Sequence, residues 1–230
     1  MSRFQILDTE KLILLLKKYT YRQLHIHHTW KPTHSSFNGT NHVELQEGMR
    51  NFHINVRGWS DIGQHLTLMP DGLWVTGRPF DIIPASIKGW NSGALAVEML
   101  GNFDIPKTGV ENNLGYDKLE GKQKQEILKL MKYFGDRFGY SSIVFHREGP
   151  NAEKTCPGTG LNKDKLIEEA KASMEFEEIR VIGEISPWAM EAMGWAIENK
   201  LINLINPKES ITLERLVTIL YRLNKLKNES

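Results

Sequence analysis

Apolar residues recur at helical spacing in four stretches of the first 175 residues. They predict helices over residues 8–18, 43–54, 118–138 and 164–174. The first begins with Asp8-Thr9, a sequence typical of a helix N-cap. The third is the longest, and its apolar stripe holds Ile127, Leu128, Met131 and Phe134.

Shorter stretches between these helices have the pattern of strands. Alternating or continuous apolar residues predict strands over residues 22–27, 65–69, 73–76, 94–100 and 143–146. Pro70-Asp71-Gly72 joins the second to the third as a turn, because proline presets φ and glycine permits a positive φ. The stretch 94–100 is nearly all apolar, which is typical of a central strand.

The pattern changes after residue 185, where only helical spacing remains. One helix carries Trp188, Trp195 and Ile197, and a second, capped by Thr212, carries Leu216 and Leu223. The chain therefore divides into an α/β domain over residues 1–175 and a small all-helical C-terminal region over residues 185–230. No repeat and no low-complexity segment accompanies this division.

Bulk composition narrows the class of protein. The chain has 230 residues, 40% hydrophobic and 25% charged, as in a globular protein. Its 29 basic and 28 acidic residues give no basic surface for nucleic acid. The apolar run Leu12 to Leu16 is too short for a signal-peptide core, and no segment reaches the ~20 apolar residues of a membrane span. We expect synthesis in a cytoplasm without a signal peptide, and no membrane insertion.

Two histidine positions and the single cysteine are candidate ligands for a metal. His27 and His28 are adjacent, so they face opposite sides of a strand and at most one joins His146 and Cys156. Two histidines and one thiolate leave the fourth position of tetrahedral zinc open, as in catalytic sites. The lysine at position 154, near Cys156, predicts a lowered thiol pKa. The competing interpretation is a satisfied core histidine and a cysteine acting as a small buried hydrophobe.

Glu98 and Lys154 add candidate chemistry to this set. Glu98 interrupts the apolar run 94–100, where an unpaired carboxylate costs several kcal/mol, so it should face a polar pocket or a cation. Near a metal it could act as a general base, and Lys154 could stabilise an oxyanion. The alternatives are a glutamate on a solvent-facing strand edge and an ordinary solvated lysine.

Six segments within about residues 20–170 follow one another in the order Ile26-His27-His28-Thr29, Trp59-Ser60-Asp61-Ile62-Gly63-Gln64-His65, Pro70-Asp71-Gly72, Ala96-Val97-Glu98-Met99-Leu100-Gly101-Asn102-Phe103, Phe145-His146 and Lys154-Thr155-Cys156-Pro157-Gly158. Together they resemble the zinc amidases that cut peptidoglycan between N-acetylmuramic acid and L-alanine. This family includes phage endolysins, bacterial muropeptide amidases and peptidoglycan recognition proteins.

The resemblance implies a site of defined composition. His27, His146 and Cys156 would hold one zinc ion per chain, and Lys154 would stabilise the oxyanion. Many members have a catalytic tyrosine where this chain has Gln64, which cannot ionise. Members without that tyrosine carry a glutamate at the position of Glu98, so the role of the base moves there.

The resemblance also implies a fold and a substrate groove. The fold is a central mixed, mostly parallel β-sheet flanked by helices, with zinc at the floor of a groove. Peptidoglycan is the expected partner. Candidates for contact with it are Trp30, Trp59, Gln64, His65, Trp90 and Asn91, and packing in the core or at the rim is the alternative for the aromatic ones.

The C-terminal region resembles one S-layer-homology unit over residues 187–222. Such units usually work in threes, and Thr212-Leu213 replaces the Thr-Arg pair of that family, so an expected polymer-binding arginine is missing. Binding of a secondary cell-wall polymer and a packing or homodimerising helical pair both remain open.

The leading functional hypothesis is a zinc-dependent N-acetylmuramoyl-L-alanine amidase, made in the host cytoplasm as a phage or prophage endolysin and acting on the wall after release. A cytoplasmic recycling amidase is an enzymatic variant of this hypothesis. A non-catalytic peptidoglycan-binding module would share the fold, but such relatives characteristically lose a zinc ligand. A histidine-metal nuclease would explain His27-His28 and leave Cys156 without a role.

Overall fold

A computed structural model describes residues 3–106, 115–150, 154–172 and 216–221. The chain separates into two units, Met1–Ala170 and Lys171–Ser230. Within the second unit, residues 171–172 and 216–221 are helical. The remainder of the helical region predicted over residues 185–230 lies outside the described residues, so its helices and its S-layer-homology resemblance stay predictions.

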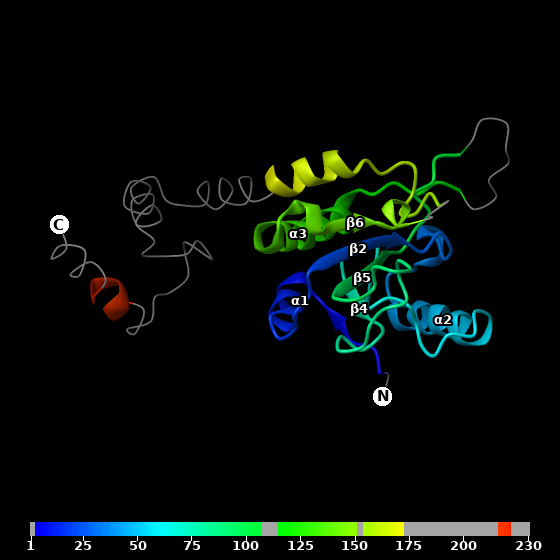
Figure 1. Cartoon of the computed structure of the whole chain (residues 1–230), viewed down its shortest axis with the longest axis horizontal. Coiled ribbons are helices and arrows are strands. Elements are labelled where there is room, and N and C mark those ends of the chain that lie inside the picture. Colours follow the sequence, from blue (N-terminus) through cyan, green and yellow to red (C-terminus); the bar gives the residue numbers. More distant parts are fainter. Residues whose placement is uncertain (1–2, 107–114, 151–153, 173–215, 222–230) are drawn as a thin grey trace. The chain divides into compact units, whose positions relative to one another are not determined.

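A six-stranded mixed sheet forms the centre of the first unit (Figure 1). In chain order the strands are β1 (Ile6–Leu7), β2 (Gln23–His28), β3 (Leu66–Leu68), β4 (Trp74–Thr76), β5 (Ala94–Met99) and β6 (Ile143–Phe145). Their order across the sheet is β1-β4-β3-β5-β2-β6. The pairings β3-β5, β5-β2 and β2-β6 are parallel, whereas β1-β4 and β4-β3 are antiparallel. The prediction of a mixed, mostly parallel sheet is confirmed.

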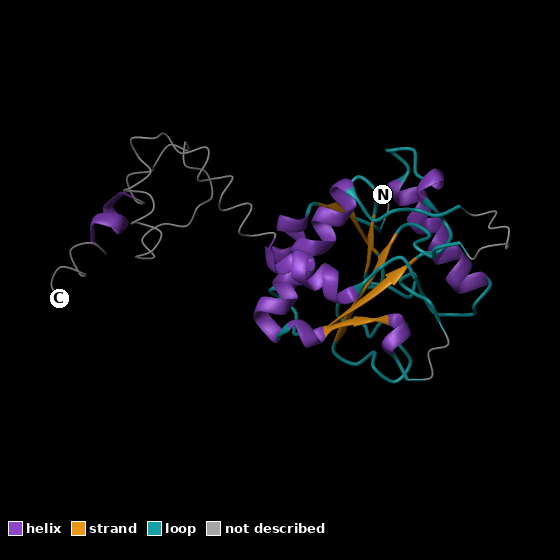
Figure 2. Ribbon diagram, turned by 90° about the horizontal axis from the view of Figure 1, so that it is seen from above, coloured by secondary structure: helices purple, strands orange, loops and turns teal. Residues whose placement is uncertain are grey.

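Helices lie on both sides of these strands (Figure 2). They are α1 (Thr9–Leu16), α2 (His42–Asn55), α3 (Gly121–Phe138) and a helix over residues 163–172, with 3₁₀ turns at His34–Ser36, Tyr140–Ser142 and His146–Glu148. The Asp8 carboxylate accepts a hydrogen bond from the backbone N–H of Lys11 and caps α1, as its sequence indicates. In the described part of the chain, no helix is long and apolar enough to cross a membrane.

The two faces of the sheet differ in chemistry because side chains alternate along each strand. One face is apolar and packs against α1 and α3 in the main core. It presents Leu24 and Ile26 from β2, Leu95 and Val97 from β5, and Leu66 and Leu68 from β3. Burial of this face orients the strands, so their other side chains point to the opposite face.

The opposite face is polar in the middle of the sheet. Gln23, His25 and His27 alternate with the core residues of β2, and Glu98 alternates with those of β5. Helix α2 packs near β4 and contributes to a second apolar cluster. The space between α2 and the polar strands is the groove described below.

Candidate metal centre and groove

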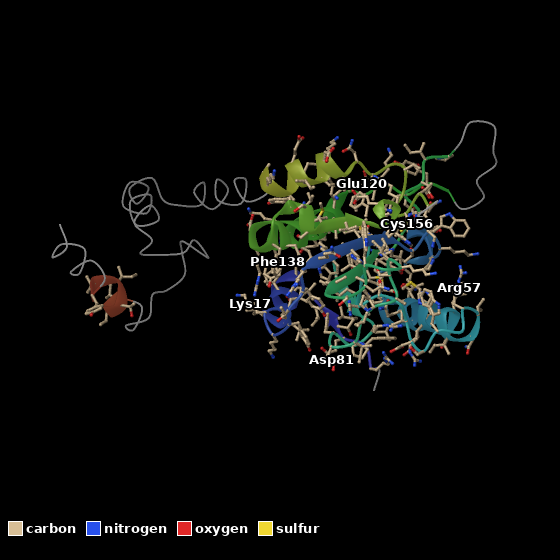
Figure 3. The ribbon with its side chains drawn as sticks, in the orientation of Figure 1. Lys17, Arg57, Asp81, Glu120, Phe138 and Cys156 are labelled. Atoms are coloured by element: carbon tan, nitrogen blue, oxygen red, sulfur yellow. The ribbon has the colours of Figure 1, made fainter. Side chains whose placement is uncertain are left out.

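His27, His146 and Cys156 come together at the carboxyl ends of β2 and β6. His27 is the second-last residue of β2, and His146 directly follows Phe145, the last residue of β6. The possible ligand atoms of the three residues all lie within 4.8 Å of one another. The cluster lies toward the end of the unit marked by Cys156 and Arg57, away from Phe138 and Lys17 (Figure 3).

The distances within the cluster fit a small tetrahedral metal. Sγ of Cys156 lies 3.5 Å from Nδ1 of His27, and the rings of His27 and His146 are 4.5 Å apart between centroids. With Zn–N near 2.0–2.1 Å and Zn–S near 2.3 Å, tetrahedral angles require an N to S separation of about 3.5 Å. The donor set of two imidazoles and one thiol also suits zinc better than a hard cation such as magnesium.

His28 does not join this cluster. Its Nδ1 accepts a hydrogen bond from the backbone N–H of Phe103 at 3.3 Å, and its ring stacks on the Phe103 ring. Phe103 belongs to the main core, on the other face of the sheet. Of the two adjacent histidines, the structure therefore groups only His27 with His146 and Cys156, and metal binding by His27 stays a prediction.

Arg147 holds the loop that carries Cys156 against the end of β6. Its backbone N–H donates to the carbonyl oxygen of Cys156 at 2.9 Å. Its guanidinium donates to the carbonyl oxygens of Gly158 at 2.8 Å and Leu161 at 2.7 Å. Because Arg147 follows His146 directly, it ties two of the three possible ligands together.

Asp104 anchors the same loop from the other side. Its carboxylate accepts hydrogen bonds from the hydroxyl of Thr155 at 2.8 Å and the backbone N–H of Thr159 at 2.9 Å. The hydroxyl of Thr159 in turn accepts from the backbone N–H of Ile105 at 2.8 Å. The position of Cys156 is therefore set by contacts on both flanks of its loop.

Glu98 lies beside His27, at the matching position of the neighbouring strand β5. Burial raises the pKa of the Glu98 carboxyl to about 8. A carboxyl group is thus placed in the groove next to the possible metal ligands, on a central strand and not at a solvent-facing edge.

The imidazoles of the cluster are uncharged near neutral pH. Burial, with a smaller repulsion from His146, lowers the pKa of His27 well below its usual value. Burial followed by the charges of Lys154 and His28 lowers the pKa of His146 to about 4. Unprotonated imidazoles keep a lone pair, which is the form that binds a metal.

The pKa of the Cys156 thiol moves in the direction opposite to the expected one. Burial raises it to about 12, with a further contribution from Glu98. A hydrogen bond from the backbone N–H of His28 and the charge of Lys154 lower it, but by less than burial raises it. The expectation from the neighbouring lysine was wrong because the sequence does not reveal how far the thiol is withdrawn from water. A bound cation would offset this cost.

The cluster opens into a groove of about 1210 Å³. Glu98, Lys154 and Ser86 line it near the cluster, and α2 contributes Met49, Phe52 and His53. Trp30 and Trp59 lie on its wall, and their side chains are about half exposed and 38% exposed. The groove therefore joins the candidate metal centre to a broad surface of aromatic and polar side chains.

The family model for N-acetylmuramoyl-L-alanine amidase matches residues 17–159, which include the sheet, the groove and all three possible ligands. The chain belongs to this amidase family. Among curated relatives it is similar to peptidoglycan-recognition protein LB of Drosophila melanogaster, with 27% identity over 59% of this chain and 54% of that protein. It is also similar to the endolysin of Klebsiella phage KP32, with 26% identity over 46% of this chain and 66% of the endolysin.

The chain thus spans about half the length of the Drosophila relative. Among solved structures, it is similar to the Ph2119 endolysin of a Thermus scotoductus bacteriophage. The TM-score is 0.49 at 22% identity, covering 66% of this chain and 86% of the endolysin. Drosophila PGRP-LB superposes with a TM-score of 0.46, covering 61% of this chain and 75% of that one.

Only some of the residues predicted to contact substrate line the groove of this amidase-family member. Trp30 and Asn91 line the groove together with Lys154. Gln64 and His65 do not line it. The amide nitrogen of Gln64 donates to the Thr67 hydroxyl at 3.0 Å. His65 is fully buried, donating from Nε2 to the carbonyl oxygen of Ile82 at 2.9 Å and accepting from a backbone N–H at Nδ1.

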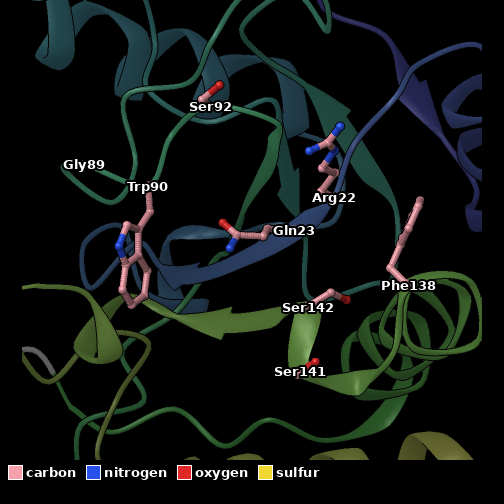
Figure 4. Close-up of a pocket in the computed structure, with 8 residues that line it drawn as sticks. All are labelled: Arg22, Gln23, Gly89, Trp90, Ser92, Phe138, Ser141 and Ser142. Carbon is pink, nitrogen blue, oxygen red and sulfur yellow. The ribbon is translucent and has the colours of Figure 1, made fainter.

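Trp90 lines a different, smaller cavity of about 480 Å³ (Figure 4). This cavity lies at the start of β2, where Gln23 is found, and not at its carboxyl end. Arg22, Phe138 and Ser142 also line it. Trp90 is therefore not brought together with the metal cluster, although its neighbour Asn91 is on the groove.

The sequence did not indicate a role for two residues near the candidate metal centre. Ser86 touches His27, and Arg147 orders the cysteine loop. Neither stands in a stretch with a hydrophobic period, and Ser86 is 59 positions from His27. Only their contacts in the folded chain reveal them.

Proposed function

We propose that the chain is a zinc-dependent N-acetylmuramoyl-L-alanine amidase. It would hydrolyse the amide bond between the lactyl group of N-acetylmuramic acid and L-alanine in peptidoglycan. The observation that carries this proposal is the placement of Glu98 beside the complete cluster of His27, His146 and Cys156 in one groove. A metal-dependent hydrolase needs a metal site and an adjacent proton carrier, whereas a binding module needs neither.

His27, His146 and Cys156 would hold one zinc ion and leave a coordination position open. Zinc bound in this way lowers the pKa of a water molecule toward ~7 and polarises a carbonyl oxygen. Apart from supplying ligands, the chain contributes proton transfer, charge and shape.

Glu98 is the proton carrier. As a carboxylate it accepts a proton from the attacking water while the water oxygen bonds to the lactyl carbonyl carbon. As a carboxylic acid it returns that proton to the alanine nitrogen as the C–N bond breaks. The second proton of the water passes to the released amino group as the new carboxylic acid ionises, so the products are a lactyl carboxylate and a protonated amino group. A carboxyl whose pKa burial has raised is suited to the second step, and a bound cation favours the first.

Lys154 contributes positive charge to the lining of the groove, which also contains Glu98. Its charge acts on His27, His146 and Cys156, since each of their pKa values is lowered by it. We assign it the stabilisation of the negative oxygen that forms when the carbonyl is attacked.

The size of the groove supports a polymeric substrate. Pockets for small molecules usually measure about 300–1,000 Å³, and this groove of about 1210 Å³ is larger and open. Trp30 and Trp59 offer aromatic surface, and Arg57 and Asn91 offer polar groups, along its walls. A glycan with a peptide stem presents both kinds of partner.

A lytic role at the cell wall is the biological setting that we propose, and the endolysins among the relatives support it. A point mutant of Drosophila PGRP-LB in complex with tracheal cytotoxin is a similar solved structure. The non-catalytic alternative, a peptidoglycan-binding module of the same fold, is the principal competitor.

The test is digestion of purified cell walls from several wall types by the zinc-loaded full chain. New amino termini and new reducing sugar ends are both measured, with metal-stripped protein and the Cys156→Ser variant in parallel. We expect amino termini of L-alanine without reducing ends, loss of activity on stripping, and recovery on adding zinc. If zinc-loaded wild type binds walls but releases neither product, the binding module becomes the better description.

A further inference from the structure

Ser86 joins two histidines on the groove face of β2. Its hydroxyl oxygen lies 2.6 Å from Nε2 of His27 and 3.0 Å from Nδ1 of His25. Its backbone N–H donates to Oδ1 of Asn91 at 3.1 Å, which ties together two parts of the loop between β4 and β5. Ser86 is therefore held in contact with a possible metal ligand from outside the cluster.

The sheet itself creates the space for this contact. Gln23, His25 and His27 lie on the same face of β2 because they are two residues apart. The register partners of Gln23 and His25 on β5 are Ala94 and Ala96. These small side chains leave room beside His25 for a loop to approach the strand.

The hydrogen bonds that link Gln23, His25, Ser86 and His27 determine which ring nitrogen of each histidine carries a proton. Oε1 of Gln23 accepts, so His25 carries its proton on Nε2, 3.1 Å away. An imidazole with one proton then has only an acceptor at Nδ1, which takes the hydroxyl proton of Ser86. The Ser86 oxygen is left to accept from Nε2 of His27, so His27 keeps a lone pair on Nδ1. That atom lies 3.5 Å from Sγ of Cys156.

We propose that Ser86 is a positioning residue of the metal centre, backed by His25. It holds the ring of His27 and selects the tautomer whose Nδ1 is free for the metal. With the opposite proton order, Nδ1 of His27 would carry a hydrogen facing the cluster, and metal binding would have to displace it. The inference rests on the proposed function only in taking the cluster to be a zinc site.

Zinc affinity tests the proposal without any need for catalysis. The dissociation constant is measured by competition with a chromophoric chelator for the full chain and the variants Ser86→Ala, Ser86→Thr and Ser92→Ala. We expect Ser86→Ala to bind zinc about 10–100-fold more weakly, the usual effect of losing a partner of a ligating histidine. Ser86→Thr keeps the hydroxyl and should stay near wild type. Ser92→Ala, an exposed serine of the same loop, should equal wild type.

A spectroscopic measurement separates positioning from packing. Nitrogen chemical shifts of labelled histidine in the metal-free protein report which nitrogen of His27 carries the proton. We expect the Nε2–H form in wild type and Ser86→Thr, and a mixture of tautomers in Ser86→Ala. His25→Phe, which keeps a ring in place but removes its acceptor, should shift the same signals in the same direction.

The proposal is overturned if Ser86→Ala binds zinc as tightly as wild type and His27 remains in the Nε2–H form. It is also overturned if Ser86→Thr and Ser86→Ala lose affinity equally with unchanged histidine shifts, since packing would then explain the loss. If wild type binds zinc tightly but cuts no wall, only the proposed hydrolysis is contradicted. The affinity results would still decide the role of Ser86.

Discussion

His27 and Glu98 lie directly opposite each other on the adjacent parallel strands β2 and β5. Neighbouring strands are about 4.8 Å apart, and paired residues project to the same face of a sheet. The distance between a possible metal ligand and the proposed proton carrier is therefore set by backbone pairing in the middle of a sheet. Sites built on strands hold their geometry better than sites built on loops.

The first prediction concerns Glu98. Glu98→Gln keeps the shape of the side chain but removes its ability to carry a proton. We expect the rate of wall hydrolysis to fall by about 10²–10⁴-fold, the usual contribution of a general base. Zinc affinity should change little, because Glu98 is not one of the three clustered ligands.

Release of amino termini and chelator competition on the same preparation measure the two effects. Glu168→Gln, on the exposed surface of the helix over residues 163–172, is the matched control and should keep full activity. An active Glu98→Gln variant would leave the reaction class standing and require a different proton carrier.

The second prediction concerns the thiol of Cys156. Because burial raises its pKa to about 12, the thiol is protonated at pH 7 in the metal-free protein. Zinc binds the thiolate, so binding at pH 7 should release about one proton from this group, and affinity should rise with pH. Calorimetry in two buffers of different ionisation enthalpy counts the released protons.

Cys156→Ser should bind zinc more weakly and release about one proton fewer at pH 7. The change in proton count separates a direct ligand from a residue that only shapes the site. Equal proton release by the variant and wild type would mean that Cys156 does not coordinate the metal.

Much of the fold could be predicted from the sequence, because burial imposes a period on it. The strand predicted over residues 22–27 is β2, and the helix predicted over residues 118–138 is α3, starting at Gly121. Strand β1 was missed, since the two residues Ile6–Leu7 are too few to show alternation. Hydrophobic patterns thus report the long elements that build the core.

The grouping of His27, His146 and Cys156 could also be predicted, because the resemblance to the zinc amidases selects these three positions. The environment of each group could not be predicted from the sequence. The pKa of Cys156 depends on how much water reaches the thiol, and the contact of Ser86 with His27 depends on how a loop crosses a strand. Gln64 and His65 follow a motif in the sequence, yet their side chains are buried away from the groove.

The third prediction concerns Arg147, whose guanidinium donates hydrogen bonds to the carbonyl oxygens of Thr155, Gly158 and Leu161 and anchors the cysteine loop. Arg147→Lys keeps the charge, but a single ammonium cannot span the carbonyls of Gly158 and Leu161 in the same way. Losing one such bond should lower the free energy of unfolding by about 1.5–3 kcal/mol. Zinc affinity should fall as well, because the loop positions Cys156.

Urea unfolding of the metal-free protein and chelator competition measure these two quantities. Lys165→Arg, on the exposed surface of the helix over residues 163–172, is a control for a change between basic residues. Unchanged zinc affinity together with reduced stability would restrict Arg147 to a structural role.

The last prediction concerns the stability of the fold at low pH. Burial lowers the pKa of His65 to about 4, and its hydrogen bond to Ile82 opposes this shift. In the unfolded chain a histidine titrates near pH 6.5. Between these values the unfolded state binds more protons than the folded state, so stability is complete above about pH 6.5 and falls as the pH drops toward 4.

The variant His65→Gln removes this titration. From pH 7 to pH 5, wild type should lose about 2 kcal/mol more unfolding free energy than the variant. The variant should nevertheless be less stable at pH 7, because His65 makes two hydrogen bonds in the core. Urea unfolding of both proteins with a chelator present, at the two pH values, measures the difference. Equal losses in wild type and variant would mean that His65 titrates normally in the folded protein.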